Sequence, residues 1–262
     1  MFSDVRFRRS LAAIITLVLI GAVLTAVWPR HKGEGVAAAA TTTTSTSSTT
    51  TTTTAPKPAH AFEAADAIVP QVNLYDAPGA TEPSDSMDNP TWEHVPLAFM
   101  VKEHGPPGWL HVQVSRRPNE RTAWIHASDV ALRPVDNRIV VQRESHVLTV
   151  YKGTTDEVLF QAPVGTGVDR TPTPLGNFFV DIVVHIDNPN GAYGPYQLSV
   201  AAFSDVLQSF DGGVGQIAIH GTNHPNLIPG YISNGCVRML NDDVTQVAAL
   251  APVGTPVSIV SS

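Results

Sequence analysis

A cysteine and a histidine late in the sequence are the residues best suited to nucleophilic catalysis. Cys236 is the one cysteine in 262 residues, and His220 precedes it by 16 positions. A free thiol has a pKa of about 8.5, so a nearby base is needed to form the thiolate nucleophile near neutral pH. His220 can supply that base. The pair therefore predicts attack by the sulfur on a carbonyl carbon.

The neighbours of Cys236 are polar and small rather than apolar. Gly235 places no side chain beside the sulfur, so we expect the backbone N–H groups of Gly235 and Cys236 to face a developing oxyanion. Arg238 is a nearby cation, which favours the thiolate. Without such neighbours, a lone cysteine is as often a small buried residue of the core, and that structural role remains an alternative.

Two motifs around this pair resemble the signature of the L,D-transpeptidases, or YkuD-type domains. They read His220-Gly221-Thr222 and Ser233-Asn234-Gly235-Cys236-Val237-Arg238-Met239. Upstream, residues 164–167 and 171–178 are similar to the family's entry to the catalytic half, and the resemblance covers about residues 137–262. One position departs from the pattern, because Asn234 stands where many members carry a second histidine. Asparagine cannot act as a base, but it still donates and accepts hydrogen bonds.

The resemblance implies a reaction on peptidoglycan stem peptides. Cys236 attacks the carbonyl of the third residue of a tetrapeptide stem, D-alanine leaves, and His220 carries the proton. The amine of a neighbouring stem then forms a 3→3 cross-link, whereas water in its place gives an L,D-carboxypeptidase. The resemblance also implies acylation by carbapenem-type β-lactams and requires no cofactor or metal.

The resemblance assigns further roles near the pair. The Gly221 carbonyl is expected to fix the His220 tautomer. The predicted orienting and oxyanion residues are Gly235, Asn234, Gly221 and Ser233. The predicted substrate-binding residues are Tyr193, Tyr196, Thr222 and Arg238. Ordinary packing is an equal alternative for the two tyrosines, and for Arg238 an ion pair with Asp242 is slightly favoured.

Short β-prone segments must position these residues. In the second half, strands are predicted at 138–142, 147–151, 158–161, 178–184, 197–201, 216–219 and 257–260. Residues 216–219 form a buried strand that ends at His220. A helix is predicted at 242–250 with Asn241 as its N-cap, because acidic residues occupy its first turn. The predicted domain is a β-sandwich or barrel with one short helix.

The first half is also β-rich. Strands are predicted at 68–75, 95–102, 109–114 and 123–126, and residues 116–120 form a polar hairpin loop. Residues 108–112 and 123–130 resemble bacterial SH3-like domains. Trp92, Trp109 and Trp124 are candidates for stacking on sugar or peptide, although core packing is favoured.

The fold class is therefore mainly β, with a small SH3-like barrel before the catalytic domain. The predicted segments are a cytoplasmic tail and transmembrane anchor (1–32), a Thr/Ser/Pro-rich linker (33–60), the SH3-like domain (61–135) and the catalytic domain (136–262). The tract at 41–54 contains only Thr and Ser, a composition that cannot bury a core and predicts a stalk.

The N-terminal segment is a membrane signal. Arg6, Arg8 and Arg9 precede an uncharged apolar run at 11–28, whose length is enough to cross a bilayer as a helix. The preceding basic residues favour a cytoplasmic N-terminus, so the rest of the chain lies outside the cell at the cell membrane. Cleavage near residues 37–40, which would give a secreted protein, is the alternative.

Charge and spacing weigh against other functions. The net charge of −7 and the pI near 5.7 argue against a nucleic-acid partner. A zinc hydrolase would use His220 and His224 with His185 or Cys236. That spacing presents both rings on one face only in a helix, whereas this segment has the composition of a turn. A catalytically inactive peptidoglycan-binding scaffold remains a second alternative.

Overall fold

The computed structural model describes residues 61–210 and 212–262, and these residues form a mainly β protein, as predicted. The predicted anchor and stalk lie outside the described residues. Within the described part of the chain, no helix combines the length and the apolar character that crossing a membrane requires.

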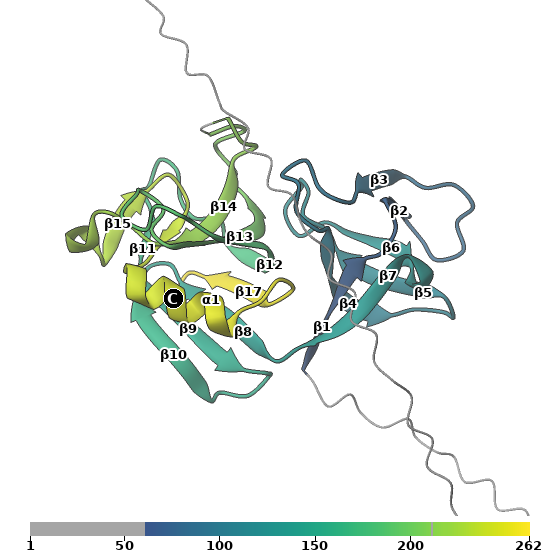
Figure 1. The fold of residues 1–262 in the computed structure, drawn as a ribbon, viewed down its shortest axis with the longest axis horizontal. Helices are drawn as coiled ribbons and strands as arrows, with labels where there is room; N and C mark the ends of the chain where they lie inside the picture. Colours follow the sequence, from purple (N-terminus) through teal and green to yellow (C-terminus); the bar gives the residue numbers. More distant parts are fainter. Residues whose placement is uncertain (1–60, 211) are drawn as a thin grey trace, which may run out of the picture. The chain divides into compact units, whose positions relative to one another are not determined.

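The first compact element, here called the N-terminal β-domain, spans residues 62–135. Its five-stranded sheet has the order β6-β5-β4-β1-β7, and a β2–β3 hairpin accompanies it (Figure 1). The strands are β1 (Phe62–Ala67), β2 (Gln71–Leu74), β3 (Asp85–Asp88), β4 (Ala98–His104), β5 (Trp109–Gln113), β6 (Thr122–His126) and β7 (Val130–Val135). A short 3-10 helix, η1 (Ala127–Asp129), precedes β7. The predicted hairpin is confirmed by the antiparallel register of β5 and β6.

The three tryptophans of this domain differ in environment. Trp109 makes an edge contact with Tyr75, and Trp124 stacks on His111 with ring centroids 4.7 Å apart. Trp92 is 69% exposed, so the favoured core role is wrong for this residue. It lies in the loop between β3 and β4, where the chain has no strand partner to cover it.

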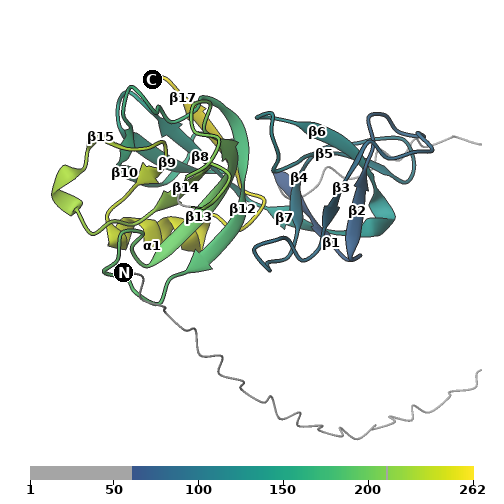
Figure 2. The same cartoon turned by 90° about the horizontal axis from the view of Figure 1, so that it is seen from above.

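The second sheet begins at Asn137 and has ten strands in the order β10-β9-β8-β17-β12-β13-β14-β16-β11-β15 (Figures 1 and 2). They are β8 (Asn137–Gln142), β9 (Val147–Lys152), β10 (Val158–Pro163), β11 (Gly165–Gly167), β12 (Gly176–His185), β13 (Tyr196–Phe203), β14 (Gln216–His220), β15 (Gly230–Ser233), β16 (Val237–Arg238) and β17 (Pro256–Val260). A 3-10 helix, η2 (Pro225–Leu227), precedes β15.

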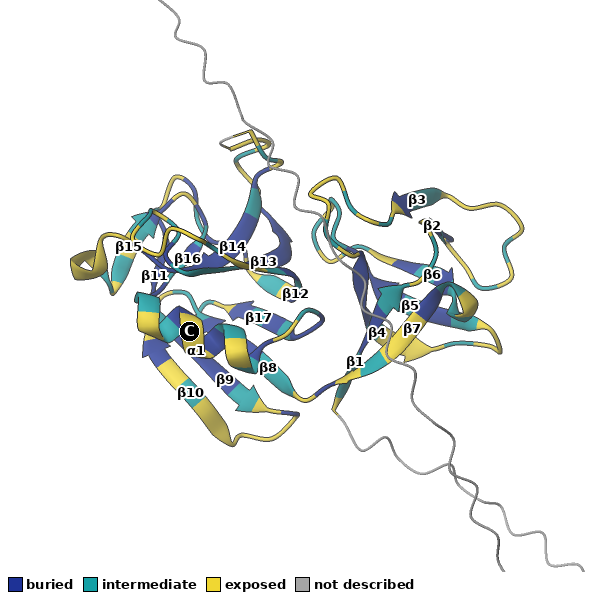
Figure 3. Cartoon of the chain, viewed as in Figure 1, coloured by how far each residue is buried: buried dark blue, intermediate teal, exposed yellow. Residues whose placement is uncertain are grey.

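A single apolar core holds this sheet to the helix α1 (Asn241–Leu250). Val244 and Val247 of α1 are fully buried in the same cluster as Phe178, Leu198 and other strand residues. Figure 3 shows the buried positions concentrated on the central strands and the exposed positions on β10 and the outer side of α1. β13 is buried along most of its length, as expected for a strand covered on both faces.

The N-cap prediction for α1 is wrong by one residue. The N-cap is Leu240, and no side chain caps the helix. Asn241 is the first helical residue, and its side chain instead accepts a hydrogen bond from the Thr222 N–H at 2.8 Å and donates one to the Pro189 carbonyl at 3.0 Å. The Asn241 side chain therefore bonds to residues distant in sequence, and it does not cap the helix as the local sequence predicts.

Candidate active site

Strand pairing brings the predicted base and nucleophile together. His220 is the last residue of β14, and β16 pairs with β14 in parallel, with His220 opposite Arg238. Cys236 immediately precedes β16, so it lies beside the end of β14. Both residues line one cavity of about 230 Å³.

The turn before Cys236 is held by hydrogen bonds from two hydroxyl groups. Ser233 Oγ donates to the Cys236 carbonyl at 2.5 Å and accepts from the Gly235 N–H at 3.1 Å. Thr173 Oγ1 donates to the Gly235 carbonyl at 2.8 Å. Gly235 has φ +124°, and a Cβ there would lie 2.9 Å from Ile217 Cδ1. The turn therefore requires glycine for both its conformation and its packing.

This bonding changes the predicted oxyanion site. The Gly235 N–H is committed to Ser233, so it does not face an incoming carbonyl oxygen. The expectation of two free amides, from Gly235 and Cys236, is wrong for Gly235. Two amides were predicted to bind the oxyanion. Of these two, the Cys236 N–H remains for that role, because the Gly235 N–H already donates to Ser233.

His220 is held as a neutral base. It is 3% exposed, and its Nδ1 lies 2.6 Å from the Gly221 carbonyl oxygen. A carbonyl only accepts, so Nδ1 carries the hydrogen and Nε2 keeps its lone pair. Burial, with a smaller contribution from the charge of Arg238, lowers the pKa of His220 to about 4 against the opposing effect of the Gly221 hydrogen bond. The imidazole is therefore unprotonated at neutral pH.

Cys236 is a neutral thiol at rest. Burial raises the pKa of its thiol, while the backbone of Ala218 and the charge of Arg238 act in the opposite direction. Arg238 lowers the pKa of the thiol, as predicted, but desolvation raises this pKa by more. The thiolate that the sequence predicted at rest is therefore not favoured. Between these two described residues no hydrogen bond joins the thiol to the imidazole. The residue is half-buried and lines the cavity, so the sulfur is not sealed in the core.

Arg238 has no acidic partner among the described residues. Its Nε is buried and makes no hydrogen bond, and no ion pair in the described part of the chain joins it to Asp242. The favoured structural pairing is therefore wrong. Arg238 instead lines the cavity together with the exposed Asn234.

The two predicted tyrosines have different positions. Tyr193 lines the cavity, and its ring centroid lies 4.7 Å from that of His220. Close approach of Gly194 to Gly221 brings this loop to the histidine, since a Cβ on Gly221 would lie 2.8 Å from the Gly194 Cα. Tyr196 packs against the core and the His185 ring, outside the cavity, so it is misplaced as a substrate-binding residue.

Thr222 also lies away from the cavity. Its N–H donates to Asn241, and its hydroxyl accepts a hydrogen bond from the His224 N–H at 3.1 Å. The predicted substrate contact of Thr222 is therefore replaced by a role in holding the loop after His220.

Sequence reasoning missed the loop between β13 and β14 as a wall of the cavity. Among its described residues, those that line the cavity are Ser204, Leu207, Phe210 and Gly215. Nothing in the local composition marks these residues, because the loop becomes part of the site only when β14 returns beside β13.

The N-terminal β-domain holds this loop through the predicted hairpin loop at 116–120. Arg117 donates to the carbonyls of Ser204 at 2.9 Å and Leu207 at 3.0 Å. Asn119 exchanges two hydrogen bonds with the Phe203 backbone, both 2.8 Å long. The presence of Arg117 and Asn119 in a polar loop could have indicated a contact with another segment. Their hydrogen-bond partners, however, lie more than eighty positions further along the chain. The first domain therefore shapes one wall of the catalytic cavity.

The ligands required by the zinc alternative do not converge in the described residues. No group of three His, Cys, Asp or Glu side chains in residues 61–210 and 212–262 is placed to hold a metal ion. His224 is exposed before η2, and His185 packs on Tyr196. His224 and His185 therefore do not join His220 as ligands, although Cys236 lines the same cavity as His220.

Comparison with known proteins identifies the second domain. Residues 136–259 match the family model of the L,D-transpeptidase catalytic domain, YkuD. The L,D-transpeptidase YkuD of Bacillus licheniformis is 37% identical over 122 residues, which make up 47% of this chain and 64% of that protein. The L,D-transpeptidase YqjB of Bacillus subtilis is 30% identical over 133 residues, which make up 48% of this chain and 72% of that protein. The chain thus spans less than two thirds of the first relative and more than two thirds of the second.

Solved structures include similar chains at lower identity. The LD transpeptidase LdtMt1, solved in complex with imipenem, is 18% identical, with a TM-score of 0.38 over 72% of this chain and 79% of that chain.

Proposed function

The chain belongs to the YkuD family of L,D-transpeptidases, and from this premise we propose that it is a peptidoglycan L,D-transpeptidase that forms an acyl-enzyme on Cys236. One observation supports the proposal most directly. Cys236 and a neutral His220, whose Nδ1 is fixed by the Gly221 carbonyl, line the same cavity. A thiol next to an unprotonated imidazole is the arrangement that general-base activation of a nucleophile needs.

In the first step, the Cys236 sulfur attacks the carbonyl carbon of the third residue of a tetrapeptide stem. The thiol proton passes to His220 Nε2 as the C–S bond forms. The Cys236 amide stabilises the tetrahedral oxyanion. Collapse breaks the C–N bond to D-alanine, and the proton on Nε2 passes to the leaving amine, so His220 ends the step neutral.

In the second step, the side-chain amine of a neighbouring stem attacks the thioester. His220 accepts a proton from that amine, the C–S bond breaks, and the proton returns to the sulfur. The product is a 3→3 cross-link and the enzyme regains its starting state. Water in place of the amine gives the carboxypeptidase product from the same acyl-enzyme.

Arg238 and Tyr193 are the residues that we assign to substrate binding. Arg238 lines the cavity and has no acidic partner among the described residues, and stem peptides carry carboxylates that a guanidinium binds through charge-assisted hydrogen bonds. The Tyr193 ring packs beside the His220 ring and restricts its orientation. We assign Asn234, exposed at the mouth, a hydrogen-bonding role toward the stem.

The neutral resting pair explains how the site avoids unwanted reactions. Proton transfer from a thiol of raised pKa to an imidazole of pKa about 4 is unfavourable before substrate binds. The transfer becomes favourable only as the C–S bond forms, because the negative charge then moves to an oxygen next to an amide donor. Carbapenem-type β-lactams also carry an electrophilic carbonyl carbon, and we propose that they acylate Cys236.

Outside the described residues, we propose that the apolar segment 11–28 anchors the chain in the cell membrane with the catalytic domain on the outer side. The basic residues before the segment and its length support this orientation.

Mass spectrometry of muropeptides tests the proposed function. The full chain is incubated with purified disaccharide-tetrapeptides, and we expect loss of D-alanine together with 3→3-linked dimers. Cys236→Ala should form neither product, because no acyl-enzyme can form. Dimers made by Cys236→Ala at the unaltered rate would refute the assignment, whereas tripeptide monomers alone would show that water is the acceptor.

A further inference from the structure

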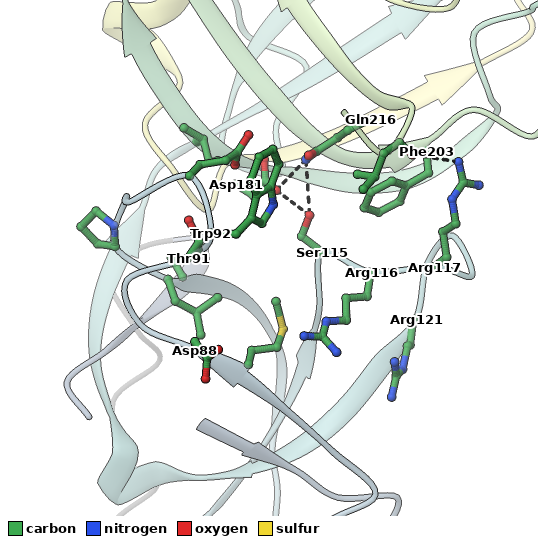
Figure 4. Close-up of a pocket in the computed structure, with 17 residues that line it drawn as sticks. Asp88, Thr91, Trp92, Ser115, Arg116, Arg117, Arg121, Asp181, Phe203 and Gln216 are labelled. Carbon is green, nitrogen blue, oxygen red and sulfur yellow. Dashed lines mark hydrogen bonds between the residues drawn. The ribbon is translucent and has the colours of Figure 1, made fainter. Parts of the chain in front are cut away.

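A second cavity lies where the N-terminal β-domain meets the catalytic domain. Its volume is about 550 Å³, within the range of small-molecule binding sites. Figure 4 shows its lining from both domains, and the residues that matter here are Thr91, Trp92, Glu93, Ser115, Asp181 and Gln216. The proposed reaction uses none of them.

Asp181, on β12, carries the feature that points to a ligand. Its Oδ2 accepts hydrogen bonds from Ser115 Oγ at 2.5 Å and Gln216 Nε2 at 2.7 Å (Figure 4). Its Oδ1 is shielded from solvent and has no hydrogen-bond partner. A buried carboxylate oxygen without a donor is costly, and native proteins rarely leave one unless something binds there. Burial also raises the pKa of Asp181, against the hydrogen bonds of Ser115 and Gln216 and the backbone of Asp181 and Ile182, so these donors do not offset desolvation.

The arginines around the cavity do not supply the missing donor. Arg116 and Arg121 both pair with Asp85, each at 2.9 Å. Arg117 donates to the backbone carbonyls of the loop after β13. The positive charge of this region is therefore already committed to partners other than Asp181.

The ionisable groups of the cavity that lack a partner of opposite charge among the described residues are the carboxyls of Glu93 and Asp181. Glu93 has no cationic partner among the described residues, and burial together with the charge of Asp181 raises the pKa of its carboxyl. Thr91 Oγ1 is also buried without a partner. A ligand that satisfies these groups must be a hydrogen-bond donor and a cation.

Trp92 adds a surface suited to a cation. Its indole is 69% exposed, although it lines the cavity. Trp92 and Asp181 line the same cavity. A cation against the face of a tryptophan gains about 0.5 to 2 kcal/mol. An exposed tryptophan in the same cavity as two carboxylates therefore provides a surface on which a cation can bind.

We propose that this cavity binds a primary ammonium group on a flexible side chain, with the carboxylates of Asp181 and Glu93 as acceptors and Trp92 as the wall. An ammonium offers three donors in a compact head, which matches two carboxylates and a hydroxyl. No group of three His, Cys, Asp or Glu side chains among the described residues is placed to hold a metal ion, and the two carboxylates and the hydroxyl of this cavity fit an organic cation.

The identity of the ligand rests on the proposed function. Stem peptides with a diamino acid at the third position carry such an ammonium group. Gln216 lines both cavities and begins β14, the strand that ends at His220. A stem peptide bound at Asp181 would therefore lie at the start of β14, and the catalytic pair lies at its end. In this proposal, the second cavity binds one peptidoglycan stem while a neighbouring stem reacts at Cys236.

An amine titration tests the binding site independently of catalysis. The probe is Nα-acetyl-lysine methylamide, and its neutral counterpart is the same compound acetylated at Nε. The readout is the Trp92 indole N–H signal in nuclear magnetic resonance spectra of the full chain, assigned by its loss in Trp92→Phe. We expect a saturable shift with the amine, no shift with the acetylated compound, and at least tenfold weaker binding by Asp181→Asn.

Asp181→Asn is a conservative variant, because its amide oxygen still accepts from Ser115 and Gln216. Asp129→Asn, at a half-buried position in η1 of the N-terminal β-domain and outside the cavity lining, is the matched control and should bind normally. Equal shifts with both compounds, or unchanged affinity in Asp181→Asn, would overturn the proposal.

A second titration uses the tetrapeptide stem, with and without acetylation of its side-chain amine, on protein whose Cys236 is first acylated by a carbapenem. Acylation blocks the catalytic cavity, so a remaining amine-dependent Trp92 shift reports the second cavity. Equal binding of the acetylated stem would reject the stem as its ligand. Failure of acylation would count against the proposed function, while the lysine titration would still decide the ammonium site.

Discussion

The two cavities meet at Gln216, and in both of them burial controls the protonation of the titratable groups. In the catalytic cavity, burial lowers the pKa of His220 and raises that of Cys236, so both groups are neutral. In the second cavity, burial raises the pKa of Asp181. The hydrogen bonds differ, however. His220 has its backbone partner on Nδ1, whereas Oδ1 of Asp181 has no hydrogen-bond partner in the part of the chain that the structure describes.

This difference separates a site prepared for proton transfer from one prepared for binding. A neutral imidazole with one nitrogen fixed has one remaining lone pair, which is what a general base requires. A half-satisfied carboxylate requires a partner from outside. Desolvation alone therefore does not identify a function, and the unpaired atom indicates which chemistry the cavity supports.

The largest expected effect is on the base. His220→Ala should lower the rate of carbapenem acylation by about 10² to 10⁴, the usual contribution of general-base catalysis. The measurement is the acylation rate against pH by intact-protein mass spectrometry. The unaltered enzyme should be flat from pH 5 to 8, because its imidazole titrates at about 4.

The variant should show a different pH profile. Its rate should rise about tenfold per pH unit, since only the thiolate fraction then reacts. A variant with the same flat profile as the parent would remove His220 from the mechanism.

The pH dependence of stability should have opposite signs in the two cavities. The folded pKa of His220 is about 4, against 6.5 for the free side chain, so its contribution is present above pH 6.5 and is lost as pH falls to 4. The loss is roughly 3 kcal/mol. Asp181 has a raised folded pKa, so its contribution is present below 3.8 and is lost as pH rises above that value.

Urea unfolding of the parent, His220→Gln and Asp181→Asn between pH 4 and 7 measures these two contributions. The parent should lose more stability than His220→Gln on acidification, and Asp181→Asn should lose more than the parent. Parallel pH curves for all three proteins would contradict the sign difference.

Thr173→Val should destabilise the catalytic turn. The Thr173 hydroxyl joins the Gly167 N–H to the Gly235 carbonyl, and valine has the same shape without the hydroxyl. Leaving two buried polar groups unpaired should cost about 1 to 3 kcal/mol of unfolding free energy. Thr245→Val, on the exposed side of α1, is the matched control and should change stability by less than about 0.5 kcal/mol.

The smallest expected effect tests whether the N-terminal β-domain shapes the catalytic cavity. Arg117→Ala removes the hydrogen bonds to Ser204 and Leu207, so the cavity wall loses its support. We expect roughly a tenfold lower acylation rate, equivalent to about 1.4 kcal/mol. Lys102→Ala, at an exposed position of the same domain, is the control. An unchanged rate in Arg117→Ala would show that the wall holds its position without this domain.

Much of the fold was predictable from local pattern. The longer strands of residues 137–262, the strands β4, β5 and β6, and α1 lie within a few residues of the predicted ranges, because alternating or continuous apolar residues mark buried strands. In the first half, β1, β3 and β7 were missed, and the strand predicted at 68–75 contains only β2. In the second half, β11, β15 and β16 were missed. These last three strands are only two to four residues long and rich in glycine or polar residues, so they carry no periodic signal, although they complete the sheet beside the catalytic turn.

The sequence by itself determined the chemistry of the pair. The types and spacing of His220 and Cys236, with glycines beside both, already indicated a base and a sulfur nucleophile. It also determined that the chain is mainly β, since its segments are short and rich in β-branched residues.

Tertiary structure alone decided the charge states and the partners. The Cys236 thiol is neutral because burial outweighs Arg238, and the Gly235 amide is lost to Ser233 because of the turn's geometry. The unpaired Asp181 oxygen arises where two domains meet. Desolvation and hydrogen bonding depend on atoms brought together from distant positions in the chain, and local sequence contains no record of them.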